Sequence, residues 1–308
     1  MALLPCANAQ EYPNRPVKLI VGYVAGGGPD VVARVLAQKL TDILGQPFVV
    51  ENRPGAGATL ASGVVARSPA DGYTLMVGET GQLVIAPYTY KNLSYNTLKD
   101  FAPIALVTSE AVLLVSNPKS GIKTLQDLIR EAKANPGKLS YGSSGVGTIH
   151  HISTEAFAAG LGLDLQHVPY KGSGQSVPGI LAGDVPVVAS GYGGVIAHIR
   201  SGALNLLAVT TTNRLPALLD TPSLSEVIKG YDFPSDTGLL APAGVPPAVV
   251  SKLAAAVKQA MDSPEFANKF KNTGITLNYK SSVDYAEHLK VNLKKYEVAT
   301  GQARIQPE

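Results

Sequence analysis

Short apolar runs rich in β-branched residues alternate along the chain with longer stretches of helical periodicity. The first run, residues 17–21, predicts a strand. A glycine-rich segment follows it, and the next apolar residues recur at helical spacing between Pro29 and Gly45. A proline in the first turn and a glycine after the last turn are typical of helix boundaries, so this stretch predicts a helix.

The same unit of strand, loop and helix recurs along the chain. Thr124-Leu125-Gln126-Asp127 has the pattern of a capping box before a helix that ends at Asn135. Strands that alternate with helices predict an α/β fold with a mostly parallel sheet covered on both faces. Further strands are predicted at residues 48–51, 74–77, 139–141, 165–168 and 185–189, and further helices at 58–66, 149–159, 246–261, 264–272 and 281–302.

Glycine- and serine-rich loops follow five of the predicted strands. In an α/β sheet the loops that leave the carboxyl ends of the strands gather at one edge, so we expect these loops to line a ligand cleft. The alternative is that their glycines only allow tight turns. The loops are residues 22–28, 78–81, 142–148, 170–174 and 190–194.

The chemistry of these loops favours an anionic ligand. A helix N-terminus carries unpaired N–H groups and a partial positive charge, and glycine lets a ligand approach that backbone closely. Lys171 is the one cationic residue in the five loops. A carboxylate bound by backbone N–H groups, hydroxyls and water is therefore predicted. Tyr23, Tyr170 and Tyr192 could add flat apolar walls, or they could be ordinary packing residues.

The loops do not match the motifs of nucleotide-binding or hydrolytic enzymes. Residues 142–146 depart from Gly-x-Ser-x-Gly at Val146, and no Gly-x-Gly-x-x-Gly or Walker loop occurs. His150 and His151 are adjacent, so on one helix their side chains point about 100° apart. We expect one to bond at the helix start and the other to face solvent. Neither a cofactor nor a metal ion is predicted.

Composition and the N-terminus indicate an exported globular protein. The 26 basic residues are spread over 308 positions for a net charge of +3, which argues against a nucleic-acid partner. No apolar run is long enough for a membrane span. Ala7-Asn8-Ala9 fits a signal-peptide cleavage site, so residues 1–10 are interpreted as a signal-peptide remnant. The alternatives are a tail without a targeting role, and a lipidated Cys6, which Pro5 disfavours.

Eight short motifs in a fixed order resemble those of the Bug-type receptors of tripartite tricarboxylate transporters, over residues 12–301. Each motif is short, but their order and spacing together are specific. They are Tyr12-Pro13-Asn14-Arg15-Pro16-Val17, Gly26-Gly27-Gly28-Pro29-Asp30-Val31-Val32-Ala33-Arg34, Val50-Glu51-Asn52-Arg53-Pro54-Gly55-Ala56-Gly57, Asp71-Gly72-Tyr73-Thr74-Leu75, Lys99-Asp100-Phe101-Ala102-Pro103, Val168-Pro169-Tyr170-Lys171-Gly172, His198-Ile199-Arg200-Ser201-Gly202 and Leu240-Ala241-Pro242-Ala243-Gly244.

The resemblance implies a two-lobed, type II periplasmic binding protein fold that closes on a small carboxylate. It implies one lobe of residues 11–108 plus 235–308, a second lobe of residues 109–234, and two crossings near residues 108 and 235. A periplasmic monomer that delivers its ligand to membrane permease subunits is expected. The predicted ligand-binding residues are Tyr23, Val24, Ala25, Gly26, Gly27, Gly28, Asp30, Glu79, Thr80, Ser143, Ser144, Gly147, Thr148, His150, Tyr170, Ser190 and Tyr192.

One departure from the family pattern bears on the ligand. Many members carry an acidic residue where this chain has Ser190, so we expect a plain or aromatic carboxylate rather than an amino-carboxylate. A para-dicarboxylate such as terephthalate is one candidate and an aliphatic dicarboxylate is the other. A second class of function stays open: an α/β hydrolase or isomerase that uses Ser143, Ser144 or His150.

Overall fold

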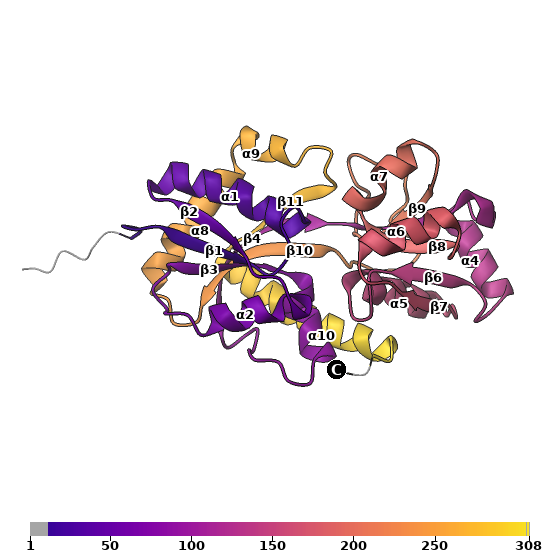
Figure 1. The fold of residues 1–308 in the computed structure, drawn as a ribbon, viewed down its shortest axis with the longest axis horizontal. Helices are drawn as coiled ribbons and strands as arrows, with labels where there is room; N and C mark the ends of the chain where they lie inside the picture. The colour runs from indigo at the N-terminus through magenta and orange to yellow at the C-terminus, as the bar shows by residue number, and fades with distance from the viewer. Residues whose placement is uncertain (1–11, 306, 308) are drawn as a thin grey trace, which may run out of the picture.

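Two mixed β-sheets, each covered by helices on both faces, form the frame of the computed structural model, which describes residues 12–305 and 307 (Figure 1). The predicted signal-peptide remnant lies outside these residues. The first sheet has the order β11 (Ile275–Lys280), β4 (Phe101–Glu110), β10 (Ser235–Pro242), β3 (Thr74–Glu79), β1 (Val17–Val21) and β2 (Phe48–Asn52). The second has the order β7 (Gln166–Pro169), β6 (Ser140–Ser143), β8 (Val187–Gly191), β5 (Val112–Ser116) and β9 (Asn205–Val209).

The predicted α/β class is confirmed, but the prediction of mostly parallel sheets was wrong. Strands β1, β2 and β3 pair in parallel, whereas β10 pairs antiparallel with both β3 and β4. The reason is that β4 carries the chain from the first sheet into β5 of the second, and β10 carries it back. Two neighbouring strands that lead in opposite directions between the sheets must run antiparallel.

Alternate residues of each strand enter different apolar clusters, as the pleat of a strand requires. On β1, Leu19 and Val21 pack against α1 (Gly28–Leu44), α8 (Pro247–Met261) and α9 (Pro264–Lys269). Ile20, between them, faces α2 (Thr59–Ala66) and α10 (Ser282–Gln302). The helices that cover the first sheet thus follow from the alternation within its strands.

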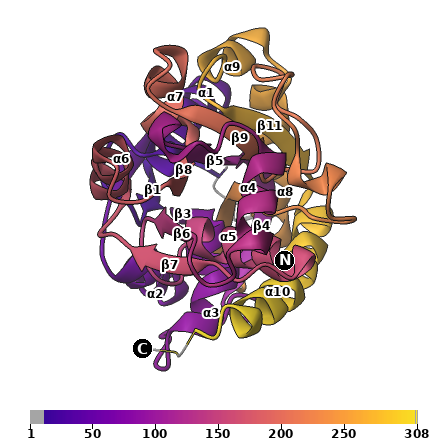
Figure 2. The same ribbon diagram turned by 90° about the vertical axis from the view of Figure 1, so that its right-hand side faces the viewer.

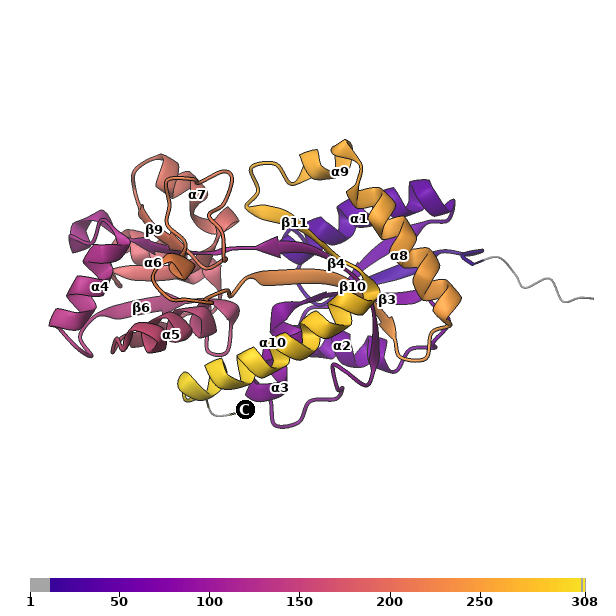
Figure 3. The ribbon, with the colours of Figure 1, turned by 180° about the vertical axis from the view of Figure 1, so that it is seen from behind.

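The second sheet is covered by α4 (Leu125–Ala134) and α5 (Ile149–Leu161) on one face and by α6 (Ser173–Ala182) and α7 (Tyr192–Arg200) on the other. Helix α10 also packs against α5, so one apolar cluster continues from the first sheet to the second (Figures 2 and 3). The short α3 (Ala86–Thr89) and helical turns at Ala56–Ala58, Gly81–Ile85, Pro118–Ser120 and Leu224–Glu226 complete the elements of the described residues.

The predicted boundary residues act as helix ends in the structure. Pro29 lies in the first turn of α1, and Gly45 ends that helix in the left-handed conformation, with φ 71°. Thr124 and Asp127 form the predicted capping box of α4. The last predicted loop is shorter than expected, because β8 extends to Gly191 and α7 begins at Tyr192.

The chain crosses between the sheets twice. The first crossing is Ala111, between the last residue of β4 and the first residue of β5, and the second leads into β10 at Ser235. The strands do not define which residues would move together as rigid bodies. The division into lobes of residues 11–108 plus 235–308 and 109–234 therefore stays a prediction.

A close contact between β10 and α10 generates a stability prediction. A Cβ at Gly238 would lie 2.6 Å from three atoms of the buried Tyr285 side chain. Gly238→Ala must therefore displace α10, and we expect it to lower the free energy of unfolding by about 1–3 kcal/mol in urea titrations. Gly174→Ala, where a Cβ meets nothing within 4 Å, is the control and should be near neutral. Equal midpoints for both variants would contradict the prediction.

Candidate functional site

A cavity of about 540 Å³ lies where the carboxyl ends of β3, β4, β6 and β8 face one another between the sheets. The first turns of four helices open onto it, at Gly28 of α1, Ile149 of α5, Ser173 of α6 and the Gly193 turn of α7. Each of the five glycine-rich loops contributes at least one residue to the lining of this cavity, as predicted.

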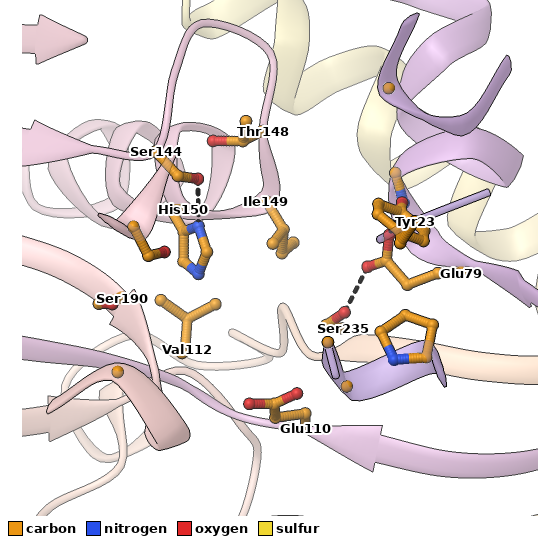
Figure 4. Close-up of a pocket in the computed structure, with 18 of the residues that line it drawn as sticks. Tyr23, Glu79, Glu110, Val112, Ser144, Thr148, Ile149, His150, Ser190 and Ser235 are labelled. Atoms are coloured by element: carbon orange, nitrogen blue, oxygen red, sulfur yellow. Dashed lines mark hydrogen bonds between the residues drawn. The ribbon is translucent and has the colours of Figure 1, made fainter. Parts of the chain in front are cut away.

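Strand register assembles the first-sheet wall of the cavity. Ser235, the first residue of β10, pairs with Glu110, the last residue of β4. On the other side of β10, Thr237 pairs with Glu79, the last residue of β3. Two carboxylates and a hydroxyl from three distant parts of the sequence therefore meet at one sheet edge (Figure 4).

Glu79 is held by three donors. The Tyr23 hydroxyl and the Gly81 N–H donate to its Oε2, and the Ser235 hydroxyl donates to its Oε1. Burial raises the pKa of the Glu79 carboxyl, and these hydrogen bonds oppose the rise. Because both oxygens are occupied, Glu79 ties the first loop to the start of β10.

Glu110 is a half-buried carboxylate with fewer partners. Burial, together with the charge of Glu79, raises its pKa to about 7, and a hydrogen bond from the Tyr192 N–H at the start of α7 opposes the rise. A Cβ at Gly28 would lie 2.9 Å from Glu110 Oε2, and a Cβ at Gly191 would lie 3.2 Å from Glu110 Oε1. The side chain thus fits between Gly28, at the start of α1, and Gly191, the last residue of β8.

The second-sheet wall carries hydroxyls and a histidine. Ser144 Oγ lies 2.5 Å from His150 Nδ1, and burial lowers the pKa of His150 to about 4, so the ring is neutral at pH 7. Thr148 caps α5 by accepting from the His151 N–H. Ser190 Oγ is buried without a hydrogen-bond partner. Figure 4 shows Ser144, His150 and Ser190 on the side of the cavity opposite to Tyr23 and Glu79.

The expectation that one of the adjacent histidines faces solvent was wrong. His151 is buried and stacks on His167, with ring centroids 3.8 Å apart. Its Nδ1 accepts from the Gly147 N–H at 3.1 Å, and Ser143 Oγ lies 2.7 Å from His167 Nε2. These side chains support the loop of residues 143–148 from behind rather than lining the cavity.

Ten of the seventeen predicted residues line the cavity. They are Tyr23, Gly26, Gly27, Gly28, Glu79, Ser144, Gly147, Thr148, His150 and Ser190. Val24 and Ala25 lie on the same loop but are exposed outside the lining, and Ser143 is buried behind it. The role of the lining residues in binding stays a prediction.

Two predicted tyrosine walls need correction. The Tyr192 side chain is 1% exposed and lies in the core of the second sheet, because this residue is in the first turn of α7 with its ring turned away from the cavity. The Tyr170 ring packs against Gly142 and Gly179, where the missing Cβ atoms leave room for it. Tyr23 and Tyr90 are the tyrosines among the described residues that line the cavity.

Asp30 and Thr80 hold the backbone around the cavity without lining it. Asp30 accepts from the Gly26 N–H at 2.8 Å and from the Asn52 amide, and it pairs with Arg34. Thr80 Oγ1 accepts from the Asp236 N–H at 2.7 Å. The bonds of Asp30 hold the Gly26–Gly28 turn in place, and the bond of Thr80 holds the start of β10.

Sequence reasoning missed Glu110, Val112 and Ser235, which all line the cavity. The available signal was the pair of crossings expected near residues 108 and 235, since the residues at a crossing lie between the sheets. The expectation of no opposing charge at Ser190 also needs correction, because Glu110 supplies a carboxylate beside Gly191. No lysine or arginine lines the cavity in the part of the chain that the structure describes.

Comparison with known proteins assigns the chain to a family. Residues 32–300 match the family model of the tripartite tricarboxylate transporter family receptor. The chain belongs to this family. BugT of Bordetella pertussis is 35% identical to this receptor over 273 residues, which cover 87% of this chain and 83% of BugT.

Solved structures of relatives agree with the receptor's fold. The periplasmic binding protein BugD superimposes with a TM-score of 0.80 at 30% identity, covering 96% of this chain and all of BugD. A Rhodopseudomonas palustris protein solved with adipate superimposes with a TM-score of 0.85 at 31% identity, covering 97% of this chain and all of that protein. The expected two-lobed periplasmic binding fold is confirmed, and the chain is a periplasmic solute-binding receptor of this family.

Two further findings concern the described residues of the receptor. None of their helices combines the length and apolar character that crossing a membrane requires. They also contain no group of three or more His, Cys, Asp or Glu side chains placed to hold a metal ion.

The position of Glu110 generates a pH prediction for the ligand-free receptor. Its pKa in the folded state, about 7, lies above the usual 4.5. Below pH 4.5 the carboxyl is protonated in both the folded and the unfolded state, so it does not lower the free energy of unfolding there. The folded state loses stability as pH rises from 4.5 through 7.

Glu110→Gln removes this loss while keeping an acceptor for the Tyr192 N–H. We expect the variant to match the wild type at pH 4.5 and to exceed its free energy of unfolding by about 1–3 kcal/mol at pH 8. Urea titrations at both pH values measure the difference. If the difference in free energy of unfolding between the variant and the wild type is the same at both pH values, the pKa of Glu110 is not raised in the folded state.

Proposed function

We propose that the cavity binds a small organic carboxylate and that the two lobes close on it for uptake through the cognate permease subunits. The observation that carries this proposal is the set of four helix first turns around a cavity whose described lining has no lysine or arginine. An anion at a helix N-terminus is stabilised by unpaired N–H groups and by the helix dipole. The related protein solved with adipate supports a carboxylate ligand.

The ligand carboxylate would contact the backbone of the Gly147–Thr148 turn, with Ser144 and Ser190 as hydroxyl partners, and the other end of the ligand would lie against Gly26–Gly28. Ser190 Oγ is buried beside the cavity without a partner, which favours a ligand contact at this atom. Binding groups from both sheets would make the closed arrangement of the lobes depend on the ligand.

The middle of the cavity is suited to either an aliphatic or an aromatic ligand. Val112 and Ile149 add apolar side chains to the lining, and both lie beside His150 (Figure 4). The ring of a para-dicarboxylate such as terephthalate would contact these two side chains rather than Tyr170 or Tyr192. An aliphatic chain fits the same walls, and the adipate-bound relative favours it.

A binding role also accounts better for the Ser144–His150 pair than hydrolysis does. In a catalytic triad, a third group orients the histidine through its other nitrogen. In this receptor, the His150 Nε2 side faces Gly191, 4.0 Å from a Cβ built there, and no hydrogen bond to it is present among the described residues. We therefore propose that the receptor, acting as a monomer, releases its ligand unchanged.

A substitution in the first loop tests the proposed site. A Cβ at Gly27 would meet only Val24 O, at an ordinary 3.5 Å, and the residue has φ −74°, so Gly27→Val should fold normally. Its side chain would fill the position where the ligand approaches the backbone. Thermal-shift screening of mono-, di- and amino-carboxylates selects the ligand, and calorimetry then measures its affinity.

We expect Gly27→Val to weaken binding at least about ten-fold, whereas Gly301→Val, at an exposed position in the last turn of α10 where a Cβ meets nothing within 4 Å, should leave affinity unchanged. Unchanged affinity in Gly27→Val would exclude the first loop from the site. Conversion of the ligand, seen by mass spectrometry after incubation, would favour the enzyme alternative.

A further inference from the structure

The two carboxylates of the cavity differ in how many donors they already have. Glu79 accepts from Tyr23, Ser235 and the Gly81 N–H, so each of its oxygens has a partner. Glu110 accepts from one backbone N–H, at the start of α7. Neither forms an ion pair with a lysine or arginine of the described residues. Glu110 is therefore the carboxylate with free acceptor positions.

The free positions of Glu110 face the cavity. The carboxylate lies at its base, between the wall of Ser144, His150 and Ser190 and the wall of Tyr23, Glu79 and Ser235 (Figure 4). A Cβ at Gly191 would lie 3.2 Å from Glu110 Oε1 and 4.0 Å from His150 Nε2, so these two polar atoms border the same small space. The partnerless Ser190 Oγ belongs to the residue before Gly191.

A half-buried carboxylate with free acceptor positions attracts a ligand group that can donate a hydrogen bond to it and repels a ligand group of the same charge. A ligand N–H placed against Glu110 gains a charge-assisted hydrogen bond. A second ligand carboxylate at the same place would lie beside Glu110 and Glu79, with no lysine or arginine among the lining residues to neutralise the charges. Like charges in contact repel strongly where bulk water is excluded. A site with an unmatched charged group rejects the wrong ligand in this way.

We propose that Glu110 is the specificity-determining residue of the cleft and selects carboxylates whose far end carries an ammonium or amide N–H group over dicarboxylates. This inference rests on the proposed function, because it places the ligand carboxylate at the Gly147–Thr148 turn and leaves the far end of the ligand at Glu110, beside Gly28. It reverses the expectation drawn from Ser190, since the acidic group missing at that position is supplied by β4 instead.

The groups that face Glu110 are consistent with this selection. They are Glu79 from β3, Ser235 from β10, His150 from α5, Ser190 from β8, and the backbone N–H of Tyr192 from α7. His150 is uncharged at pH 7 and the others are acceptors, hydroxyls or a backbone donor already in use. A cationic or N–H-bearing group is thus the complement that the described part of this wall lacks.

Ligands of equal length test the inference. Adipate, 6-aminohexanoate and the monoamide of adipic acid share a six-carbon chain with one carboxylate and differ at the far end. Calorimetry at about pH 8, where Glu110 is ionised, compares the three ligands in the wild type, Glu110→Gln, Glu110→Asp and the surface control Glu131→Gln. Glutamine keeps an acceptor for the Tyr192 N–H, so this variant should fold.

We expect the wild type and Glu131→Gln to bind an N–H-bearing ligand at least about ten-fold more tightly than adipate. Glu110→Gln should lose this preference and bind adipate more tightly, and Glu110→Asp should retain part of it. A wild type that prefers adipate, with the same preference in Glu110→Gln, would overturn the inference and leave the proposed function standing. Failure of all carboxylates in the screen to bind would instead overturn the proposed function.

Discussion

The register between β4 and β10 determines the arrangement of the cleft. These two strands carry the chain out of the first sheet and back into it, and their pairing sets Ser235 opposite Glu110. Because β10 also pairs with β3, Glu79 lies on the same edge. A shift of one residue would turn each side chain of the slipped strand to the opposite face of the sheet. The two crossings and the polar wall are thus one structural feature rather than two.

The electrostatics of the cleft combine positive helix ends with negative side chains. Four helix first turns surround the cavity, and each contributes unpaired N–H groups. Such groups stabilise a carboxylate without a salt bridge, whether it belongs to the protein or to a ligand. Glu110 already occupies one of these positions, at the start of α7. The protein therefore uses the same interaction internally that the proposed function assigns to the ligand.

The sequence predicted features set by local chemistry and missed those set by long-range pairing. Proline and glycine at 29 and 45 bounded α1, and the glycine-rich loops predicted the cavity, because these signals act within a few residues. Glu110 reaches the cavity only through the pairing of β4 with a strand about 125 residues later in the chain. Tyr192 was assigned to a loop because no local signal showed that β8 extends to Gly191 and that α7 begins at the next residue.

Tyr192 links the specificity of the cleft to the relative position of the sheets. Its N–H donates to Glu110 at the end of β4, and its ring lies against Gly274, beside β11 of the first sheet. A Cβ at Gly274 would lie 2.3 Å from Tyr192 Cβ, and its φ of 79° is strained for other residues. Tyr192, at the start of α7, therefore contacts the first-sheet side at two points, through one hydrogen bond and one packing contact. Any change in the angle between the sheets must alter the contact of Tyr192 with Gly274, its hydrogen bond to Glu110, or both. The position of the Glu110 carboxylate in the cleft therefore depends on how the lobes are arranged.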